Sequence, residues 1–178
     1  MLCQGRGFRG RLPIKHETII GYRTDYTGIV EYRFAQGTDT VLTCASIMTP
    51  DIITSSLNGY GYTLLSEIRE TTLAPGARVD VREKESQQLV FSYRHLSIES
   101  REIVIGGQVI SVGCHPGKYV FAKERLQVAR MKKANVFYHI LPTTRPETEP
   151  YFECEFYGQL TGLEKTAMLA FPILCYWL

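Results

Sequence analysis

The chain has 178 residues, 44% hydrophobic and 21% charged, a balance that excludes an intrinsically disordered chain and suits one globular domain. Its formal net charge of +2 is too small to indicate a nucleic-acid-binding protein by itself, so such a role depends on where the basic residues cluster. The longest apolar run, residues 167–178, is interrupted by Pro172 and falls well short of the ~20 residues that span a bilayer.

Residues 1–15 are predicted to form a flexible arm, because several closely spaced glycines leave this segment little reason to order alone. Arginine contacts phosphates and stacks on bases, and phenylalanine offers a platform for an unpaired base. The RNA-binding candidates in the arm are therefore Arg6, Phe8, Arg9, Arg11 and Lys15. A solvated terminus that keeps the protein soluble is the alternative interpretation.

Residues 16–178 are predicted to form one domain of short strands, since β-like runs and turn residues follow one another at fairly even spacing. The expected strands are 28–34, 40–45, 60–68, 78–82, 88–94, 102–105, 108–113, 134–141, 151–157 and 167–178. Gly106 and Gly107 fit a two-residue hairpin turn. This spacing favours a sandwich or barrel over an α/β fold.

The strand near the end of the chain has the clearest alternation. Phe152, Cys154 and Phe156 share one face, and Glu153 and Glu155 share the other. We expect the first face to be buried and the second to be solvated.

Two helical segments are also expected. Thr49 is predicted to be a helix N-cap, and Pro50 is predicted to take the first helical position. Together they indicate a short helix that extends towards residue 57. Residues 122–133 could form three helical turns.

The motifs of common catalytic sites are missing from the sequence. There is no GxSxG, P-loop or GxGxxG, and the four histidines include no HxH pair. The five cysteines form no CxxC pair and are expected to be mostly buried thiols. We therefore expect no enzyme, no cofactor and no metal site.

A second basic cluster lies within sixteen residues of the chain. It comprises Lys118, Lys123, Arg125, Arg130, Lys132 and Lys133. With the arm it holds half of the twenty lysines and arginines, so the positive charge is unevenly distributed. RNA contact and an ordinary solvated face are both compatible with this pattern, and Lys123, Arg125, Arg130, Lys132 and Lys133 are the RNA-binding candidates.

The order of segments in the second half resembles that of a known family. Residues 89–94 lead to the run 105–113, whose Gly-Gly-Gln turn starts a strand, and a proline-rich loop precedes the strand 151–157. This arrangement is similar to the C-terminal half of the jelly-roll coat proteins of tymoviruses and related small RNA viruses.

The resemblance implies an eight-stranded antiparallel jelly-roll sandwich with one or two short helices. It also implies a capsid protein that self-assembles into an icosahedral shell of many copies and packages single-stranded RNA. Such a protein resides in the virion, and in the host cytoplasm before assembly, without membrane attachment. The apolar C-terminal residues are then candidates for the subunit interface: Phe171, Ile173, Tyr176, Trp177 and Leu178.

The C-terminal run could equally be a core strand and not an interface. Three alternative functions also remain open at this point. One is an RNA-binding structural subunit of a large ribonucleoprotein, and another is a metal-free jelly-roll enzyme. The third is a non-viral β-sandwich binding module that presents exposed aromatic residues around one concave site.

The arm hypothesis predicts that deletion of residues 1–11 leaves the melting temperature unchanged and weakens retention of single-stranded RNA. If Arg6, Arg9, Arg11 and Lys15 all contact phosphates, the logarithm of affinity should fall against the logarithm of salt with a slope of about −3. Filter binding at several salt concentrations measures both the affinity for RNA and its dependence on salt. A deletion variant that melts much earlier than the full chain would contradict the arm.

Overall fold

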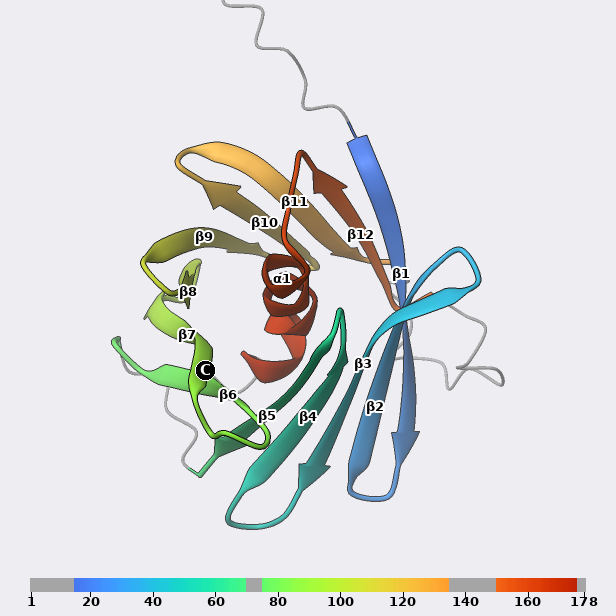
Figure 1. Ribbon diagram of the computed structural model, residues 1–178, viewed down its shortest axis with the longest axis vertical. Coiled ribbons are helices and arrows are strands. Elements are labelled where there is room, and N and C mark those ends of the chain that lie inside the picture. Colours follow the sequence, from blue (N-terminus) through green and yellow to red (C-terminus); the bar gives the residue numbers. More distant parts are fainter. Residues whose placement is uncertain (1–14, 70–74, 135–149, 176–178) are drawn as a thin grey trace, which may run out of the picture.

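The computed structural model describes residues 15–69, 75–134 and 150–175 (Figure 1). Most of these residues form strands, and the apolar C-terminal segment forms a helix. The elements in chain order are β1 (Lys15–Tyr26), β2 (Ile29–Gln36), β3 (Asp39–Met48), β4 (Ile53–Gly59), β5 (Tyr62–Ile68), β6 (Arg78–Glu83), β7 (Leu89–Ser97), β8 (Ser100–Ile105), β9 (Gln108–His115), β10 (Lys118–Lys123), β11 (Leu126–Lys133), β12 (Phe152–Tyr157) and α1 (Gly162–Leu174).

The strands form a closed antiparallel barrel. Each strand pairs with the next in sequence, and β12 pairs with β1 to close the ring. Figure 1 shows α1 inside this ring, surrounded by the strands. Within the described residues, no helix is long and apolar enough to cross a membrane.

The predicted eight-stranded jelly-roll sandwich is therefore wrong. A jelly roll needs connections that cross between two sheets, whereas the described strands follow one another around a single closed sheet of twelve. Alternating apolar and polar residues specify a half-buried strand but do not specify which strands become neighbours, so the pattern alone could not separate the two folds.

Several local predictions are confirmed. The predicted strand 28–34 lies in β2 except for its first residue, the segment 40–45 lies within β3, and Ile105 pairs with Gln108 across the Gly106–Gly107 turn. In β12, Phe152, Cys154 and Phe156 are buried, as the alternation predicted.

The two predicted helices are wrong. Thr49 belongs to a turn in which its N–H and its hydroxyl both donate to the Ile52 carbonyl, and β4 follows at Ile53. The segment 122–133 is the β10–β11 hairpin, because its inward residues alternate with period two, as Ala129 and Met131 do.

The C-terminal run was expected to be a strand or an interface, and its described part is helical. Its residues are apolar on every side, and a helix of that kind has to be buried all round. A capping box starts α1: the Thr161 hydroxyl accepts from the Glu164 N–H, and the Glu164 carboxylate accepts from the Thr161 N–H.

The core forms where the inward strand faces contact α1. The Phe171 ring lies 5.7 Å from Tyr93, 5.2 Å from Tyr119 and 5.7 Å from Phe121, in edge-to-face contacts. The Tyr93 hydroxyl donates to the Ala167 carbonyl at 2.6 Å, so the barrel wall also holds the helix by a buried hydrogen bond.

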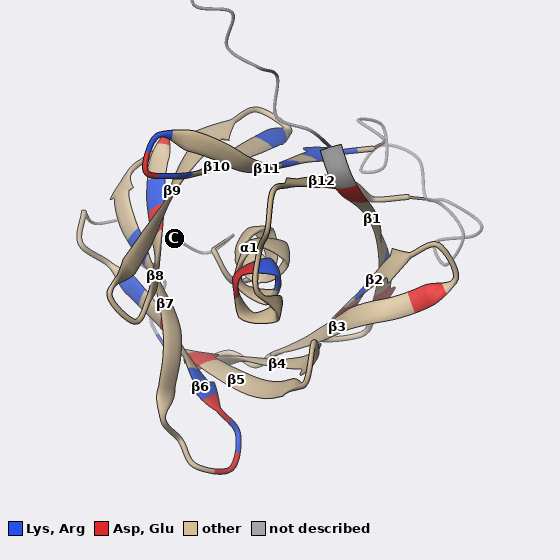
Figure 2. Ribbon diagram, turned by 45° about the horizontal axis from the view of Figure 1, so that its top comes forward, with Lys and Arg blue, Asp and Glu red and all other residues tan. Residues whose placement is uncertain are grey.

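Charge pairs hold the first turn of α1. Glu164 of the helix pairs with Lys123 of β10, and Lys165 pairs with Glu17 of β1. In Figure 2 the charged residues of α1 gather at one end of the helix. Both partners come from the barrel wall, so these pairs fix the depth of the helix in the barrel.

Replacing Phe171 with Ala should lower the free energy of unfolding by about 3–5 kcal/mol, because the side chain is only 2% exposed and its removal leaves a cavity. Urea denaturation measures this loss. The control is Leu126→Ala, since Leu126 is 72% exposed at the start of β11 and should change stability by less than ~0.5 kcal/mol. Equal effects of the two substitutions would contradict the buried position of α1.

The Glu164 carboxylate should make stability depend on pH. Burial alone would raise its pKa, but hydrogen bonds from Lys123 and Thr161 outweigh burial and hold the pKa below its ordinary value. A carboxyl group with a lower pKa in the folded state stabilises the fold above its unfolded pKa, and this stabilisation is lost as pH falls through the folded pKa.

We therefore expect the urea midpoint of the native chain to fall between about pH 5 and pH 3, and to fall less in Glu164→Gln. Glu124→Gln is the control, since Glu124 is exposed in the turn after β10 and should keep the native pH dependence. An identical pH dependence in Glu164→Gln and in the native chain would contradict a stabilising role for the ionised Glu164 carboxylate.

Candidate functional site

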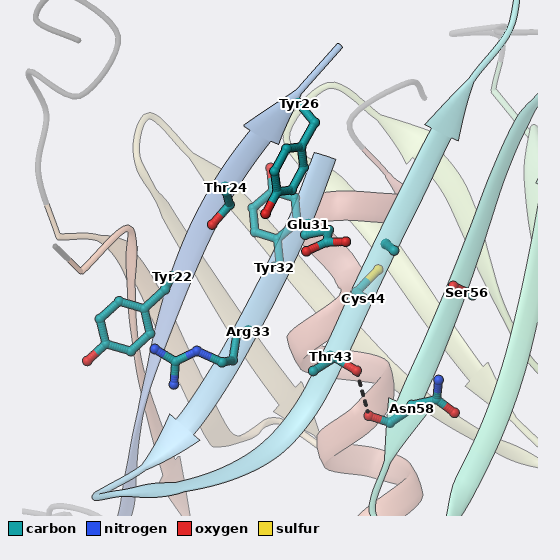
Figure 3. Close-up of a pocket in the computed structure, with 11 residues that line it drawn as sticks. Tyr22, Thr24, Tyr26, Glu31, Tyr32, Arg33, Thr43, Cys44, Ser56 and Asn58 are labelled. Carbon is teal, nitrogen blue, oxygen red and sulfur yellow. Dashed lines mark hydrogen bonds between the residues drawn. The ribbon is translucent and has the colours of Figure 1, made fainter. Parts of the chain in front are cut away.

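A groove with a volume of about 660 Å³ crosses the outer face of β1 to β4 (Figure 3). This volume lies within the range of pockets that bind small molecules. The lining residues are Tyr22, Thr24, Tyr26, Glu31, Tyr32, Arg33, Thr43, Cys44, Ala45, Ser56 and Asn58.

Strand register arranges the outward residues in rows. One row runs across the four strands from Tyr22 to Asn58 through directly paired positions. Its members are Tyr22, Arg33, Thr43 and Asn58. The next row, two residues along each strand, contains Thr24, Glu31, Ala45 and Ser56. Neighbouring strands are ~4.8 Å apart, so each row spans roughly 14 Å.

Tyrosine rings border the groove on β1. Tyr26 is 56% exposed, and Figure 3 shows it at one corner of the site. Tyr22 lies further back along β1 in this view, with the Arg33 guanidinium 4.4 Å from its ring centroid. This cation–π contact orients the Arg33 guanidinium against the Tyr22 ring.

Small polar side chains form the floor. The Thr43 hydroxyl donates to the Asn58 carbonyl at 3.4 Å, which ties β3 to β4 beneath the groove. Ala45 and Ser56 are short, so the floor between Tyr26 and Asn58 is lower than its aromatic edge. The hydroxyl, amide and carboxylate groups give the floor both donors and acceptors.

Two of the lining residues point into the barrel and contribute no reactive group. Burial raises the pKa of the Cys44 thiol to about 12, so the thiol stays protonated at neutral pH. Burial also raises the pKa of the Tyr32 phenol above its ordinary value. Among the described residues, no group of three His, Cys, Asp or Glu side chains could hold a metal ion. The groove is equipped to bind a ligand by stacking and hydrogen bonding.

The predicted RNA-binding residues of β10 and β11 do not share one face. Arg130 and Lys132 point outward, where they pair with Glu155 and Glu153 of β12. Lys123 points inward to Glu164 at the start of α1.

The remaining predicted basic residues are scattered. Lys133 faces the end of the barrel where α1 terminates, and Arg125 lies in the turn after β10 with φ 69°. Lys15 is the first residue of β1, and its side chain is not described. Arg6, Phe8, Arg9 and Arg11 lie outside the described residues.

The predicted subunit interface is also placed differently. Phe171 and Ile173 are buried in the barrel core, so their side chains are not exposed to a neighbouring subunit. Tyr176, Trp177 and Leu178 lie outside the described residues.

Sequence reasoning missed the groove because it placed no strand at residues 15–26. The signal was the alternation of Tyr22, Thr24 and Tyr26, which puts two aromatic residues and a hydroxyl on one strand face. Register could not be read from the sequence, so the alignment of this face with Glu31 and Arg33 of β2 was not predictable.

No family model, no curated protein and no solved structure matches this chain.

Proposed function

We propose that the chain is a binding protein without catalytic activity, whose outer groove binds a neutral, hydroxyl-rich ligand of the oligosaccharide class. One observation carries this proposal: strand register aligns two tyrosines of β1 with a floor of small hydroxyl and amide side chains. Sugar rings offer apolar faces for stacking on tyrosine, and their hydroxyl groups both donate and accept hydrogen bonds.

The charge of the groove supports a neutral ligand. Among its described lining residues Arg33 is the cation and Glu31 the anion, and they balance. A site for single-stranded RNA would combine aromatic platforms with an excess of positive charge along a groove. The outward cations Arg130 and Lys132, on the β11 face, are paired with carboxylates and supply no such excess to the groove.

The capsid hypothesis stays a prediction. The resemblance that suggested it implied a jelly roll, which the barrel replaces. Of its proposed interface residues, Phe171 and Ile173 fill the core, which removes one reason to expect a shell. A pure protein that sediments as large uniform particles would favour the capsid over a binding domain.

The test is binding of the pure chain to an array of immobilised neutral oligosaccharides, followed by calorimetric titration of the best one. Tyr26→Ala should raise the dissociation constant at least about tenfold, since a stacking platform is lost. The fold should be unaffected because Tyr26 is 56% exposed.

Tyr62→Ala is the matched control, because Tyr62 is an exposed tyrosine on β5 and does not line the groove. It should bind like the native chain. Failure of every neutral oligosaccharide to bind, or equal binding by Tyr26→Ala and the native chain, would rule the proposal out.

A further inference from the structure

A second cavity, with a volume of about 530 Å³, lies at the end of the barrel where α1 terminates. Its described lining comes from β1, β2, β3, β10, β11, β12 and the last turn of α1. The cavity lies inside the barrel rim and shares only Tyr32 with the outer groove. Its volume is within the range of pockets that bind small molecules.

Apolar and aromatic side chains form most of the wall of this cavity. The Tyr32 ring is stacked on Phe152 with ring centroids 6.1 Å apart, and the Tyr151 ring lies edge-on to Phe152 at 4.7 Å. Pro172 and Ile173 of α1 add aliphatic surface. A wall of this kind favours a ligand with an apolar body.

The two cations in the lining are engaged by other groups of the protein. Arg23 donates to the Asp25 carboxylate at 2.8 Å and to the Tyr151 hydroxyl at 3.1 Å. The Lys133 ammonium lies 5.9 Å from the centroid of the Tyr151 ring, and both cations have further interactions within the chain. Because these charges already have partners, the cavity does not require an anionic ligand.

Most hydroxyl groups in the lining are also engaged or hydrated. The Ser46 hydroxyl is hydrogen-bonded to the Ser55 hydroxyl at 2.8 Å, and the Tyr151 hydroxyl accepts the hydrogen bond described above. Tyr119 is only partly buried, so water can hydrate its hydroxyl. The hydroxyl of Tyr32 is left as the polar group that a ligand can satisfy.

The Tyr32 side chain is only 9% exposed, and its hydroxyl has no hydrogen-bond partner within residues 15–69, 75–134 and 150–175. Burial raises the pKa of this phenol, so it stays protonated at neutral pH and can donate. A donor that is withdrawn from water without a partner loses hydrogen-bond energy. An acceptor oxygen on a ligand in the cavity would restore it.

We propose that this end of the barrel binds an uncharged, largely apolar molecule that carries an acceptor oxygen. The Tyr32 hydroxyl donates to that oxygen, and the apolar body packs on Phe152 and on the last turn of α1. Ketones, esters and amides share the required acceptor. The proposal goes beyond the outer groove, because the groove residue Tyr26 does not line this cavity.

The probe is propionyl-dimethylaminonaphthalene, an uncharged fluorescent dye with a ketone, whose emission reports its transfer out of water. We expect the full chain to bind it with one-site stoichiometry. Tyr32→Phe keeps the ring and removes the donor, so it should weaken binding about fivefold, the size of one net hydrogen bond. Tyr62→Phe is the matched control, because Tyr62 does not line the cavity, and it should bind the dye like the native chain.

Dimethylaminonaphthalene, the same aromatic body without the ketone, separates the hydrogen bond from adsorption on apolar surface. The native chain and Tyr32→Phe should bind this second dye equally well. Equal weakening of both dyes by Tyr32→Phe, or no weakening of either, would overturn the proposal.

A cavity-filling substitution tests the location of the dyes. Met48 lines the cavity and is 38% exposed, so Met48→Trp should occupy the space, keep the fold and weaken binding of both dyes at least about tenfold. Ile47→Trp is the control, since Ile47 is the adjacent residue of β3, is 48% exposed and does not line the cavity. Circular dichroism of each variant checks the fold. Equal effects of the two substitutions would place the dyes elsewhere and refute the site.

The sulfonate dye anilinonaphthalene sulfonate tests whether the ligand is uncharged. It should bind less tightly than the ketone dye, and tighter binding of the sulfonate would contradict the proposed ligand class. Tyr26→Ala should bind the ketone dye like the native chain. Failure of the oligosaccharide test therefore leaves this proposal intact, and loss of ketone-dye binding in Tyr26→Ala would contradict two separate sites.

Discussion

Burial of α1 within the ring of strands is the contact on which the rest of this structure depends. An eight-stranded barrel can be filled by its own side chains, but a ring of twelve encloses a wider space. A helix with its side chains is ~10 Å across and fills that space. The apolar side chains of the inner strand faces are buried against the helix, and the outer faces of the strands carry polar groups. The groove over β1 to β4 is one such outer face.

The helix also has a defined direction within the ring, and charge supports it. Glu164 lies in the first turn, where the partial positive charge of the helix N-terminus favours a carboxylate. Arg23 and Lys133 lie around the opposite end, where the carbonyl groups favour cations. The last turn of α1 contains no basic residue, so the barrel wall supplies the complementary charge there.

Local structure could be predicted from this sequence where two-residue alternation was strong, as at Phe152, Cys154 and Phe156. It could not be predicted where a segment was apolar on every side, because residues 167–174 have neither a strand period nor a helical stripe. The closure of β12 on β1 depends on register between segments far apart in sequence, which no local pattern encodes. The basic cluster was visible, but its distribution over both faces of a hairpin was not, since those residues were expected to be helical.

The position of α1 in the chain has a consequence for biosynthesis. All twelve strands of the described residues precede the helix in sequence, so during translation they emerge from the ribosome before the segment that fills their interior. Until then the strands can form local hairpins, but their apolar inner faces have no partner. The nascent chain therefore exposes a large hydrophobic surface until α1 has been synthesised, and surfaces of this kind are prone to aggregate. A chain that ended before residue 162 would contain every described strand but not the helix that fills the barrel.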